Sequence, residues 1–528
     1  MDQLMKHSSQ IFLVLSALAL GLNTCATTYY VNVANPAPAA PFTNWPTAAT
    51  DIQSAIDVAT NGDIVLVTNG VYQTGGRTVN GYALTNRVVV TKPLTIQSVN
   101  GPAITAIQGY QIPGSTNGNA AVRCIYLTNN AVLSGFTLTS GATRQFSAGD
   151  IIHEQSGAGV WCESTNAVLS NCVVIANVAP SGGGGAYSGT LNNCLLVSNQ
   201  MTWSGGGGGG ASGSRLNHCT LTGNSGTSGG GAFQSVLNYC SISNNLGMAG
   251  GGVYGSQLNN CIVSHNLQSA LGGSGHGGGV CFGVTLNCTI VGNTANGQYG
   301  GIYGGDVSNC IIYYNTCKPS YPDYFNCQNS SYLNYCCTTP FVSAGTGNIT
   351  NAPLFANFDG GDYQLLANSA CINSGMNSDV IGTNDFDGNP RIVGGTVDIG
   401  AYEFQTPTSV LSYAWAQQYG LPTDGSADFV DTDGDGFNNW QEWIAGTIPT
   451  NSASLLQMLS ASNSVSGTKV TWQSVTGRTY FLLRGTNLAM QPVFSSIKTN
   501  LTGLAGATSF TDTTATNGDS FFYRVGVQ

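Results

Sequence analysis

The stretch GGGGAYSGTLNNCLLVSN, residues 182–199, decides the fold, because its pattern recurs along the chain. Each copy has a glycine run, a small or branched residue and often an aromatic one, and then a Leu, one or two Asn and a Cys. An aliphatic residue follows the Cys by two positions, and an Asn follows it by five. The period of 21 to 27 residues predicts a solenoid. Seven copies centre on Cys172, Cys194, Cys219, Cys240, Cys261, Cys288 and Cys310.

The residues around each Cys alternate in character, which is typical of a β-strand. The Cys and the residue two positions later are apolar in every copy, whereas the residue between them varies from Thr to Leu. A period of two places the constant side chains on the inward face. The return segments are rich in Gly, Ser and Asn, which are poor helix formers. The repeat therefore predicts a right-handed parallel β-helix, with one copy per coil, rather than a leucine-rich repeat.

Stacked coils would bring equivalent residues of successive copies together at roughly 4.8 Å. We expect inward ladders of Leu, Cys and Asn, in which each Asn hydrogen-bonds the turn backbone and its stacked neighbours. An eighth copy around Cys336 lacks the Asn. The ladder Asn residues are Asn177, Asn199, Asn224, Asn245, Asn266, Asn293 and Asn315.

Whether a cysteine is a free thiol or part of a disulfide is expected to depend on its place in the repeat. Regular ladder positions favour small buried thiols, since stacked neighbours have parallel Cβ vectors that suit a disulfide badly. Four further cysteines fall where the repeat breaks down, and one or two disulfides are expected among them. These are Cys317, Cys327, Cys336 and Cys337.

The composition fits an extracellular protein. Only 7% of the residues are charged, the formal net charge is −10, and 72 of the 528 residues are glycine. We expect no binding to nucleic acid, because such binding needs a basic surface and this chain is acidic. Lys6 and the apolar run 11–22 predict a secretory signal peptide over 1–26, with lipid attachment at Cys25 as an alternative. No transmembrane segment is expected in the mature chain, which we expect to be a monomer.

The mature chain divides into three parts by composition. Residues 27–404 are expected to form the β-helix, with an N-terminal cap and first coils over 27–100 and a closing segment over 340–404. Within the cap, residues 51–60 predict a short amphipathic helix. Residues 405–453 form a linker, and residues 454–528 alternate in a way that predicts a small antiparallel β-sandwich.

The linker holds the clearest chemical motif in the chain, DTDGDGFNNWQE at residues 431–442. It matches the EF-hand frame, in which hard oxygen ligands wrap around Ca²⁺ in a fixed order. A short helix on each side completes the expected linker, and a structural role for the ion is favoured over a sensor role. The expected ligands are Asp431, Asp433, Asp435, the Phe437 carbonyl, Asn439 through a water, and bidentate Glu442.

These motifs resemble known families. The repeat is similar to the right-handed parallel β-helix proteins of the pectin-lyase-like superfamily over residues 27–404. The runs SACINSG (369–375), DFDGNPR (385–391) and DIGAYE (398–403) resemble the closing segment of secreted bacterial proteins of the choice-of-anchor Q type. The acidic loop resembles the calcium loops of dockerin and thrombospondin type 3 repeats. The resemblance implies a secreted or cell-surface life with a C-terminal attachment module, and it implies no particular reaction.

A column seven positions before the Cys predicts a possible glycan-binding face. The residue before each member is small or branched and is expected inside, so the column is expected to face outward. Aromatic rings there could stack on the sugar rings of a polysaccharide, or could form a ladder that only stabilises the sheet. The aromatic members are Tyr187, Phe233, Tyr254 and Tyr303.

Charged residues are too sparse in the repeat for a paired catalytic site. Between residues 160 and 316 the chain has only Glu163, Arg215 and Asp306. Lyases and hydrolases of this fold need carboxylates beside a cation, and an insertion after residue 139 is the remaining place for them. Solvated loop charges are the alternative for this group. The candidates are Arg144, Asp150, His153, Glu154 and Glu163.

Two functions remain after this search. The first is a secreted or cell-surface protein that binds a polysaccharide or another surface component without cleaving it. The second is a polysaccharide lyase or glycoside hydrolase that acts beside the 140–163 insertion. The sequence favours the first, because the repeat lacks a catalytic constellation.

Overall fold

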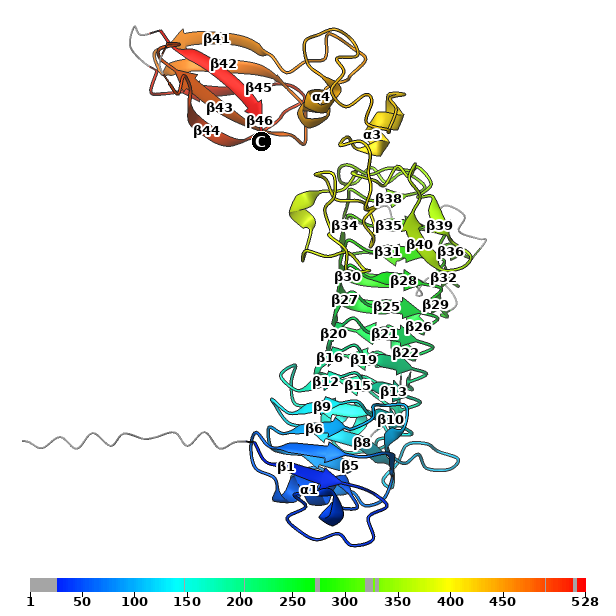
Figure 1. Ribbon diagram of the computed structural model, residues 1–528. Helices are drawn as coiled ribbons and strands as arrows, with labels where there is room; N and C mark the ends of the chain where they lie inside the picture. The colour runs from blue at the N-terminus through cyan, green and yellow to red at the C-terminus, as the bar shows by residue number, and fades with distance from the viewer. Residues whose placement is uncertain are drawn as a thin grey trace, which may run out of the picture.

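Figure 1 shows the computed structural model, an elongated solenoid followed by a linker and a small β-sandwich. The expected signal peptide lies almost wholly outside the residues that the structure describes. None of the helices in the described residues is long and apolar enough to cross a membrane. The described residues are 26–146, 148–203, 205–270, 276–318, 326–327, 332–489, 491–515 and 520–528.

The solenoid is the predicted right-handed parallel β-helix, built from three sheets whose strands pair in parallel between successive coils. One hairpin, β4 with β5, is antiparallel. The first sheet contains β1 (Thr28–Val31), β2 (Ile64–Val67), β4 (Arg77–Thr78), β5 (Thr85–Val90), β6 (Thr95–Ser98), β8 (Val122–Leu127), β9 (Val132–Ser134), β11 (Val160–Cys162), β12 (Val168–Ser170), β15 (Ala186–Tyr187), β16 (Thr190–Asn192), β19 (Ala211–Ser212), β20 (Arg215–Asn217), β23 (Ala232–Phe233), β24 (Val236–Asn238), β27 (Val253–Asn259), β30 (Val280–Leu286), β33 (Ile302–Tyr303), β34 (Asp306–Ser308) and β37 (Tyr332–Asn334).

The two other sheets are also built from strands of successive coils, and the third sheet begins only at β14. The second sheet contains β3 (Gly70–Tyr72), β7 (Thr105–Gln108), β10 (Thr137–Thr139), β13 (Val173–Ile175), β17 (Leu195–Val197), β21 (Thr220–Thr222), β25 (Ser241–Ser243), β28 (Ile262–Ser264), β31 (Thr289–Val291), β35 (Ile311–Tyr313) and β38 (Cys337–Thr338). The third sheet contains β14 (Val178–Ala179), β18 (Gln200–Met201), β22 (Ser225–Ser228), β26 (Leu246–Ala249), β29 (Leu267–Gln268), β32 (Thr294–Ala295) and β36 (Thr316–Cys317).

Two corners in each regular coil are made by residues in the left-handed conformation. In one coil Asn193 has φ 51° and Ser198 has φ 52°. The first corner lies between the inward Leu and the Cys: Leu191 belongs to β16 of the first sheet, and β17 of the second sheet begins directly after Cys194. The sequence pattern did not separate these two strands. Asn is frequent at the first corner because its short polar side chain tolerates this conformation.

The Asn ladder predicted from the sequence is confirmed, and it is buried. Asn245 donates through Nδ2 to the Leu221 carbonyl and to Asn266 Oδ1, each at 2.9 Å. Its own Oδ1 accepts from the backbone N–H and the Nδ2 of Asn224, at 2.9 and 3.0 Å. Asn326, which lies before the eighth copy, extends the ladder, because its Oδ1 accepts from Asn315 Nδ2 at 3.0 Å. The place that the repeat leaves vacant is thus filled from another part of the sequence.

Close contact between coils explains the glycine runs. A Cβ at Gly184 would lie 2.3 Å from the Gln200 carbonyl oxygen, and one at Gly185 would lie 2.7 Å from the Gly210 carbonyl oxygen. Real Cβ atoms do not approach backbone atoms this closely, so these two positions accept only glycine. The high glycine content therefore has a geometric cause.

The regular ladder cysteines are buried thiols, as expected. The disulfides expected at the break in the repeat are wrong for three of the four cysteines, which carry free thiols. Cys336 continues the ladder inside the solenoid, whereas Cys337 packs in a separate apolar cluster under the closing segment. Cys327 lies 3.6 Å from the Thr338 hydroxyl, and Cys317 lies in β36. Because the side chains of Cys336 and Cys337 enter different apolar clusters, their closeness in sequence does not bring their sulfurs together.

Both ends of the solenoid are covered. The predicted N-terminal helix is α1 (Ile52–Val58), whose Asp51 cap accepts from the Ser54 N–H at 2.8 Å, and a short helix η1 (Trp45–Thr47) precedes it. The apolar face of α1 packs into the core, which protects the first coil. The closing segment includes β39 (Phe355–Asn357), β40 (Asp362–Leu365) and η2 (Asn377–Asp379).

The closing segment is held by a buried ionic network. Arg391 Nη1 lies 3.5 Å from Glu403 Oε2, and both side chains are fully buried. Asp398 accepts from the N–H groups of Asn373 and Phe404, each at 2.7 Å. Removing Arg391 would leave Glu403 buried without its cationic partner, so the ion pair helps to fix this segment in one place.

The linker and the sandwich follow the closing segment. The linker contains α3 (Tyr413–Gln418) and α4 (Asn439–Ala445). The sandwich packs Trp472 and Tyr480 between two antiparallel sheets. Arg478 Nη2 donates to the Trp443 carbonyl at 2.8 Å, which joins the sandwich to α4. The sheets contain β41 (Met458–Ser464), β42 (Gly467–Ser474) and β45 (Gly506–Asp512), and β43 (Thr479–Gly485), β44 (Ser495–Thr502) and β46 (Phe522–Val527).

Candidate functional site

The insertion folds into a short helix, α2 (Ile151–Gln155), and one of its charges is buried beneath it. Glu154 is only 4% exposed, lies 3.1 Å from Arg144, and accepts from the N–H groups of Leu84 and Asp150 at 3.1 and 2.9 Å. Burial alone would raise the pKa of Glu154, but these N–H groups and the Arg144 guanidinium lower it below the ordinary value. The alternative of solvated loop charges is therefore wrong for Glu154.

The remaining insertion candidates form two further pairs. Asp150 caps α2 and lies 2.8 Å from His153 Nδ1, while the His153 ring stacks on Tyr82 with the centroids 4.1 Å apart. Glu163 accepts from the Tyr126 hydroxyl at 2.7 Å. The structure thus brings all five candidates to one end of the first sheet, but as three separate pairs.

A buried arginine that the sequence did not reveal lies below α2. Arg123 is 2% exposed and donates to the carbonyl oxygens of Gly157 and Ser156, each at 2.9 Å, and to Asn86 Oδ1 at 2.8 Å. Burial lowers its pKa to about 9. Its donors are used to fix the insertion, and no sequence signal marked it because it precedes the first regular copy.

The aromatic column lies on the outer face of the first sheet, where strand register joins its members coil by coil. Residues just before the members, such as Ala186 and Val253, are fully buried inside. The column begins earlier than the sequence indicated, because Tyr126 and Trp161 continue it beneath α2. The insertion and the aromatic column therefore form one surface. In order its members are Val89, Tyr126, Trp161, Tyr187, Ser212, Phe233, Tyr254, Cys281 and Tyr303.

The rings of this column stack on one another along the solenoid axis. Trp161 lies 6.1 Å from Tyr187 at 10°, and Phe233 lies 5.7 Å from Tyr254 at 22°. In such a stack the face of each ring contacts its neighbour, so mainly the ring edges face the solvent. Phe282, which the sequence did not single out, is 43% exposed and meets the Tyr254 ring edge-on at 5.8 Å.

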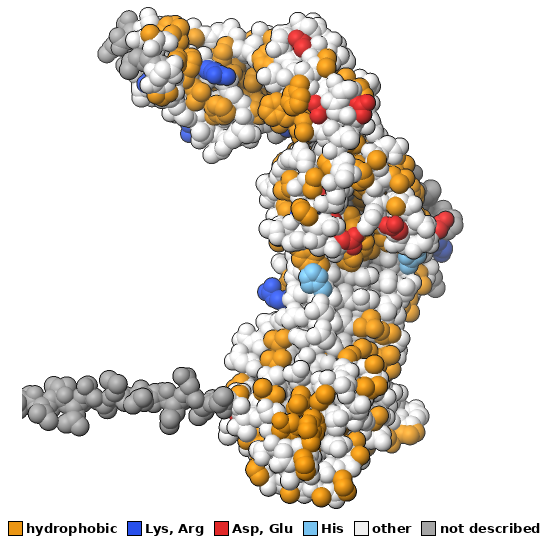
Figure 2. Space-filling view, in the orientation of Figure 1, with side chains coloured by type: hydrophobic (Ala, Val, Ile, Leu, Met, Phe, Trp, Pro, Cys, Tyr) orange, Lys and Arg blue, Asp and Glu red, His pale blue; other side chains and the backbone are white. Residues whose placement is uncertain are grey.

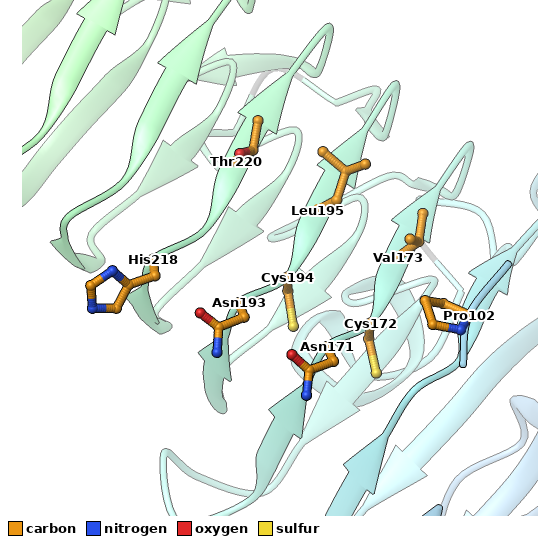
Figure 3. Close-up of a pocket in the computed structure, with 9 residues that line it drawn as sticks. All are labelled: Pro102, Asn171, Cys172, Val173, Asn193, Cys194, Leu195, His218 and Thr220. Carbon is orange, nitrogen blue, oxygen red and sulfur yellow. The ribbon is translucent and has the colours of Figure 1, made fainter. Parts of the chain in front are cut away.

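A groove of about 410 Å³ lies on a different face, the outer side of the second sheet (Figure 3). Its lining combines first-corner residues with outward residues of β13, β17 and β21, and the labelled Asn and His side chains project away from the core. None of the nine lining residues is charged. They are Pro102, Asn171, Cys172, Val173, Asn193, Cys194, Leu195, His218 and Thr220.

The acidic loop of the linker has the shape of a cation site. The side-chain oxygens of Asp431, Asp433 and Asp435 lie within 4.8 Å of one another. One oxygen each of Asp433, Asp435 and Glu442 is buried without a hydrogen-bond partner among the described residues. Glu442 is 1% exposed, and burial and the neighbouring aspartates raise its pKa to about 7. Unpaired buried carboxylate oxygens of this kind fit a bound cation.

The carboxamide of Asn439, which is expected to act on the ion through a water, has partners within the linker. Its Oδ1 accepts from the Thr432 hydroxyl at 2.9 Å, and its Nδ2 donates to the Ala427 carbonyl at 2.8 Å. The carboxamide is thus used to fold the loop. Asp431 and Asp435 shape the turn as well, since Asp431 accepts from the Gly436 N–H at 2.9 Å and Asp435 accepts from the Phe437 N–H at 2.8 Å.

Charge is distributed unevenly over the molecule. Figure 2 shows a face on which charged side chains are sparse along the middle of the solenoid, while acidic side chains gather near its upper end and the linker. The exposed middle coils therefore offer hydroxyl, carboxamide and aromatic groups rather than ions.

No protein-family model matches the chain, and no curated protein matches it. Solved structures with a similar fold include the pectate lyase Pel9A, at 15% identity and a TM-score of 0.45, over 72% of this chain and 96% of the lyase. A rhamnogalacturonan lyase matches at 13% identity and a TM-score of 0.35, over 70% and 96%. XylC in complex with xylose matches at 10% identity and a TM-score of 0.37, over 72% and 98%. The likeness is one of fold alone, and the assignment of the β-helix stands on the strand register of this chain.

Proposed function

We propose that this protein is a secreted or cell-surface β-helix that binds a polysaccharide or another surface component along its coils without cleaving it. The observation that carries the proposal is the outward aromatic column, in which rings recur in register from coil to coil, with Ser212 and Cys281 as interruptions, over a surface nearly free of charge. A repeating face suits a repeating polymer. The scarcity of cations favours a neutral chain over a polyanion.

The contacts of the charged residues in the insertion also support a non-catalytic function. A general acid or base needs a carboxyl group that can reach the substrate and change its protonation state. Glu154 is buried with its oxygens used by N–H donors and Arg144, and Glu163 accepts three hydrogen bonds. These contacts suit groups that hold the insertion on the sheet.

We further propose that Ca²⁺ binds at residues 431–442, where it would be held by Asp431, Asp433, Asp435, Glu442 and the Phe437 carbonyl. The buried oxygens without partners support this assignment. The ion would stabilise the loop before α4, which Arg478 links to the sandwich. The C-terminal module would then serve as an attachment or binding unit, in line with the resemblance of the closing segment to surface-anchored proteins.

Replacing Tyr254 by Ala is expected to reduce retention on the polysaccharide that the protein binds by roughly tenfold, because the change removes about 1.4 kcal/mol of apolar contact with the ring edge. The measurement is affinity electrophoresis against a panel of neutral and acidic polysaccharides, with the reaction products analysed in parallel. Tyr332→Ala, at a 68% exposed tyrosine outside the column, is the matched control. Unchanged retention by Tyr254→Ala, or release of oligosaccharides by the wild type, would count against the proposal.

Replacing Glu154 by Gln tests the role of the insertion. The amide cannot accept from all of the N–H donors and no longer pairs with Arg144, so we expect a loss of about 1–3 kcal/mol in unfolding free energy. Polysaccharide binding should remain at temperatures where the variant is folded. If Glu154→Gln instead abolished a cleavage activity and left the melting temperature unchanged, the lyase or hydrolase alternative would be correct.

A further inference from the structure

The groove on the second sheet is a trough with two closed ends. Its floor is one outward column, Val173, Leu195 and Thr220, paired coil by coil, and it continues to Ser241. At the N-terminal end the preceding member, Thr137, donates to the Pro102 carbonyl at 2.7 Å, so the turn at Pro102 covers it. At the C-terminal end the next member, Ile262, is 6% exposed because it packs under the closing segment. Four coils therefore remain open, a span of roughly 14 Å between the first and the last.

The wall of the trough is the first-corner column. Asn171 and Asn193 are exposed, and their carboxamides project from the corner, as Figure 3 shows. His218 and Tyr239 follow, with their rings stacked at 4.9 Å and 4°. The wall ends there, because the closing segment meets it: a Cβ at Gly382 would lie 2.4 Å from the Tyr239 hydroxyl oxygen. The trough therefore offers two carboxamides and an aromatic pair beside an aliphatic and hydroxyl floor.

This chemistry excludes most classes of ligand. A nucleic acid or an acidic polymer would need cations, and none of the nine lining residues is charged. A peptide strand would need a free sheet edge, whereas the second sheet pairs each of these strands on both sides. An apolar small molecule would need an enclosed pocket, and this one is open along its length. A ligand with many uncharged hydroxyl groups and apolar C–H faces could hydrogen-bond the carboxamides and hydroxyl groups and pack on the aromatic and aliphatic side chains of the trough.

We propose that this trough is a second binding site, distinct from the aromatic column, and that it takes a short neutral oligosaccharide or the end of a neutral polysaccharide. This inference rests on the proposed glycan-binding function and adds the location, the charge class and the length of the ligand. The ends formed by Pro102 and the closing segment limit the ligand to the few sugar units that four coils can contact. A chain that runs past the trough in both directions would have to leave the floor.

The test uses the full mature chain and the double substitution Asn193→Gly and His218→Gly. Both positions have φ near 51°, so glycine removes the side chains without backbone strain. Asn130→Gly, at another exposed left-handed position outside the trough, is the matched control. Binding is measured by calorimetry with neutral tri- to pentasaccharides of glucose, xylose and mannose, and with an oligogalacturonate of equal length as the charged comparison.

We expect the wild type and Asn130→Gly to bind at least one neutral oligosaccharide in preference to oligogalacturonate, and the double variant to bind it at least tenfold more weakly. Equal binding by the double variant, or a preference for the charged oligosaccharide, would overturn the trough site. If polysaccharide retention depends on Tyr254 while no oligosaccharide binds, the trough fails and the proposed function stands. If neither polysaccharide nor oligosaccharide binds, both fail.

Discussion

Asn245→Ala is expected to lower the unfolding free energy by about 3–5 kcal/mol, because it removes three hydrogen bonds that buried groups of the preceding coil make to Asn245. The Asn224 N–H loses its acceptor, Asn224 Nδ2 keeps the Leu196 carbonyl but loses its second acceptor, and the Leu221 carbonyl loses its donor. Asn245 is only 1% exposed, so water cannot take its place. Urea unfolding followed by far-UV circular dichroism measures the change.

The neighbouring residue provides the control for this prediction. Asn244 precedes Asn245 in the same coil, is exposed, and has φ 55°. Glycine accepts that conformation, so Asn244→Gly is expected to change the unfolding free energy by less than about 0.5 kcal/mol. Equal effects of the two substitutions would show that the ladder hydrogen bonds contribute little and that the coil is held mainly by apolar burial.

Removing one carboxylate from the acidic loop is expected to weaken calcium binding on the order of 100-fold, because affinity in such loops depends on the number of charged ligands. Asp433→Ala removes a side chain with an unpartnered buried oxygen, and Glu442→Gln neutralises the ligand on α4. Calorimetric titration of the calcium-free protein measures the affinity. Asp359→Asn, at an exposed acid outside the loop, should bind as the wild type does.

Calcium is also expected to raise the stability of the linker and the sandwich. At a free concentration 100 times the Kd, a ligand that binds only the folded state contributes about 2.7 kcal/mol. In scanning calorimetry, chelation should therefore lower the transition of the C-terminal module and leave that of the solenoid in place. A thermogram that does not respond to chelation, together with no measurable heat of calcium binding, would contradict the proposed site.

The repeat could be predicted from the sequence because its constraints are local and recur. The inward Cys and the Asn five positions later need the same side chains in every coil, so Cys194 and Asn199 have counterparts along the chain. The acidic loop could be predicted for a similar reason, since its carboxylates lie within twelve consecutive residues. Asn326 could not, because it joins the ladder from outside the period.

Contacts between distant segments could not be predicted from periodicity. Glu154 is buried because the N–H groups of Ala83 and Leu84 reach it from about 70 positions earlier. Trp161 joins the aromatic column although it precedes the first regular copy. The state of the irregular cysteines could not be predicted for the same reason, since closeness in sequence does not fix where a side chain enters the core.

The sequence by itself determined the period, the inward ladders, the closing segment and the residues of the acidic loop, because each depends on a fixed spacing of side chains. Only the tertiary structure decided which faces are open. The insertion covers the start of the aromatic column, and the Pro102 turn and the closing segment end the trough beside His218. These boundaries arise where segments far apart in the chain pack on the coils, and no spacing within the repeat encodes such contacts.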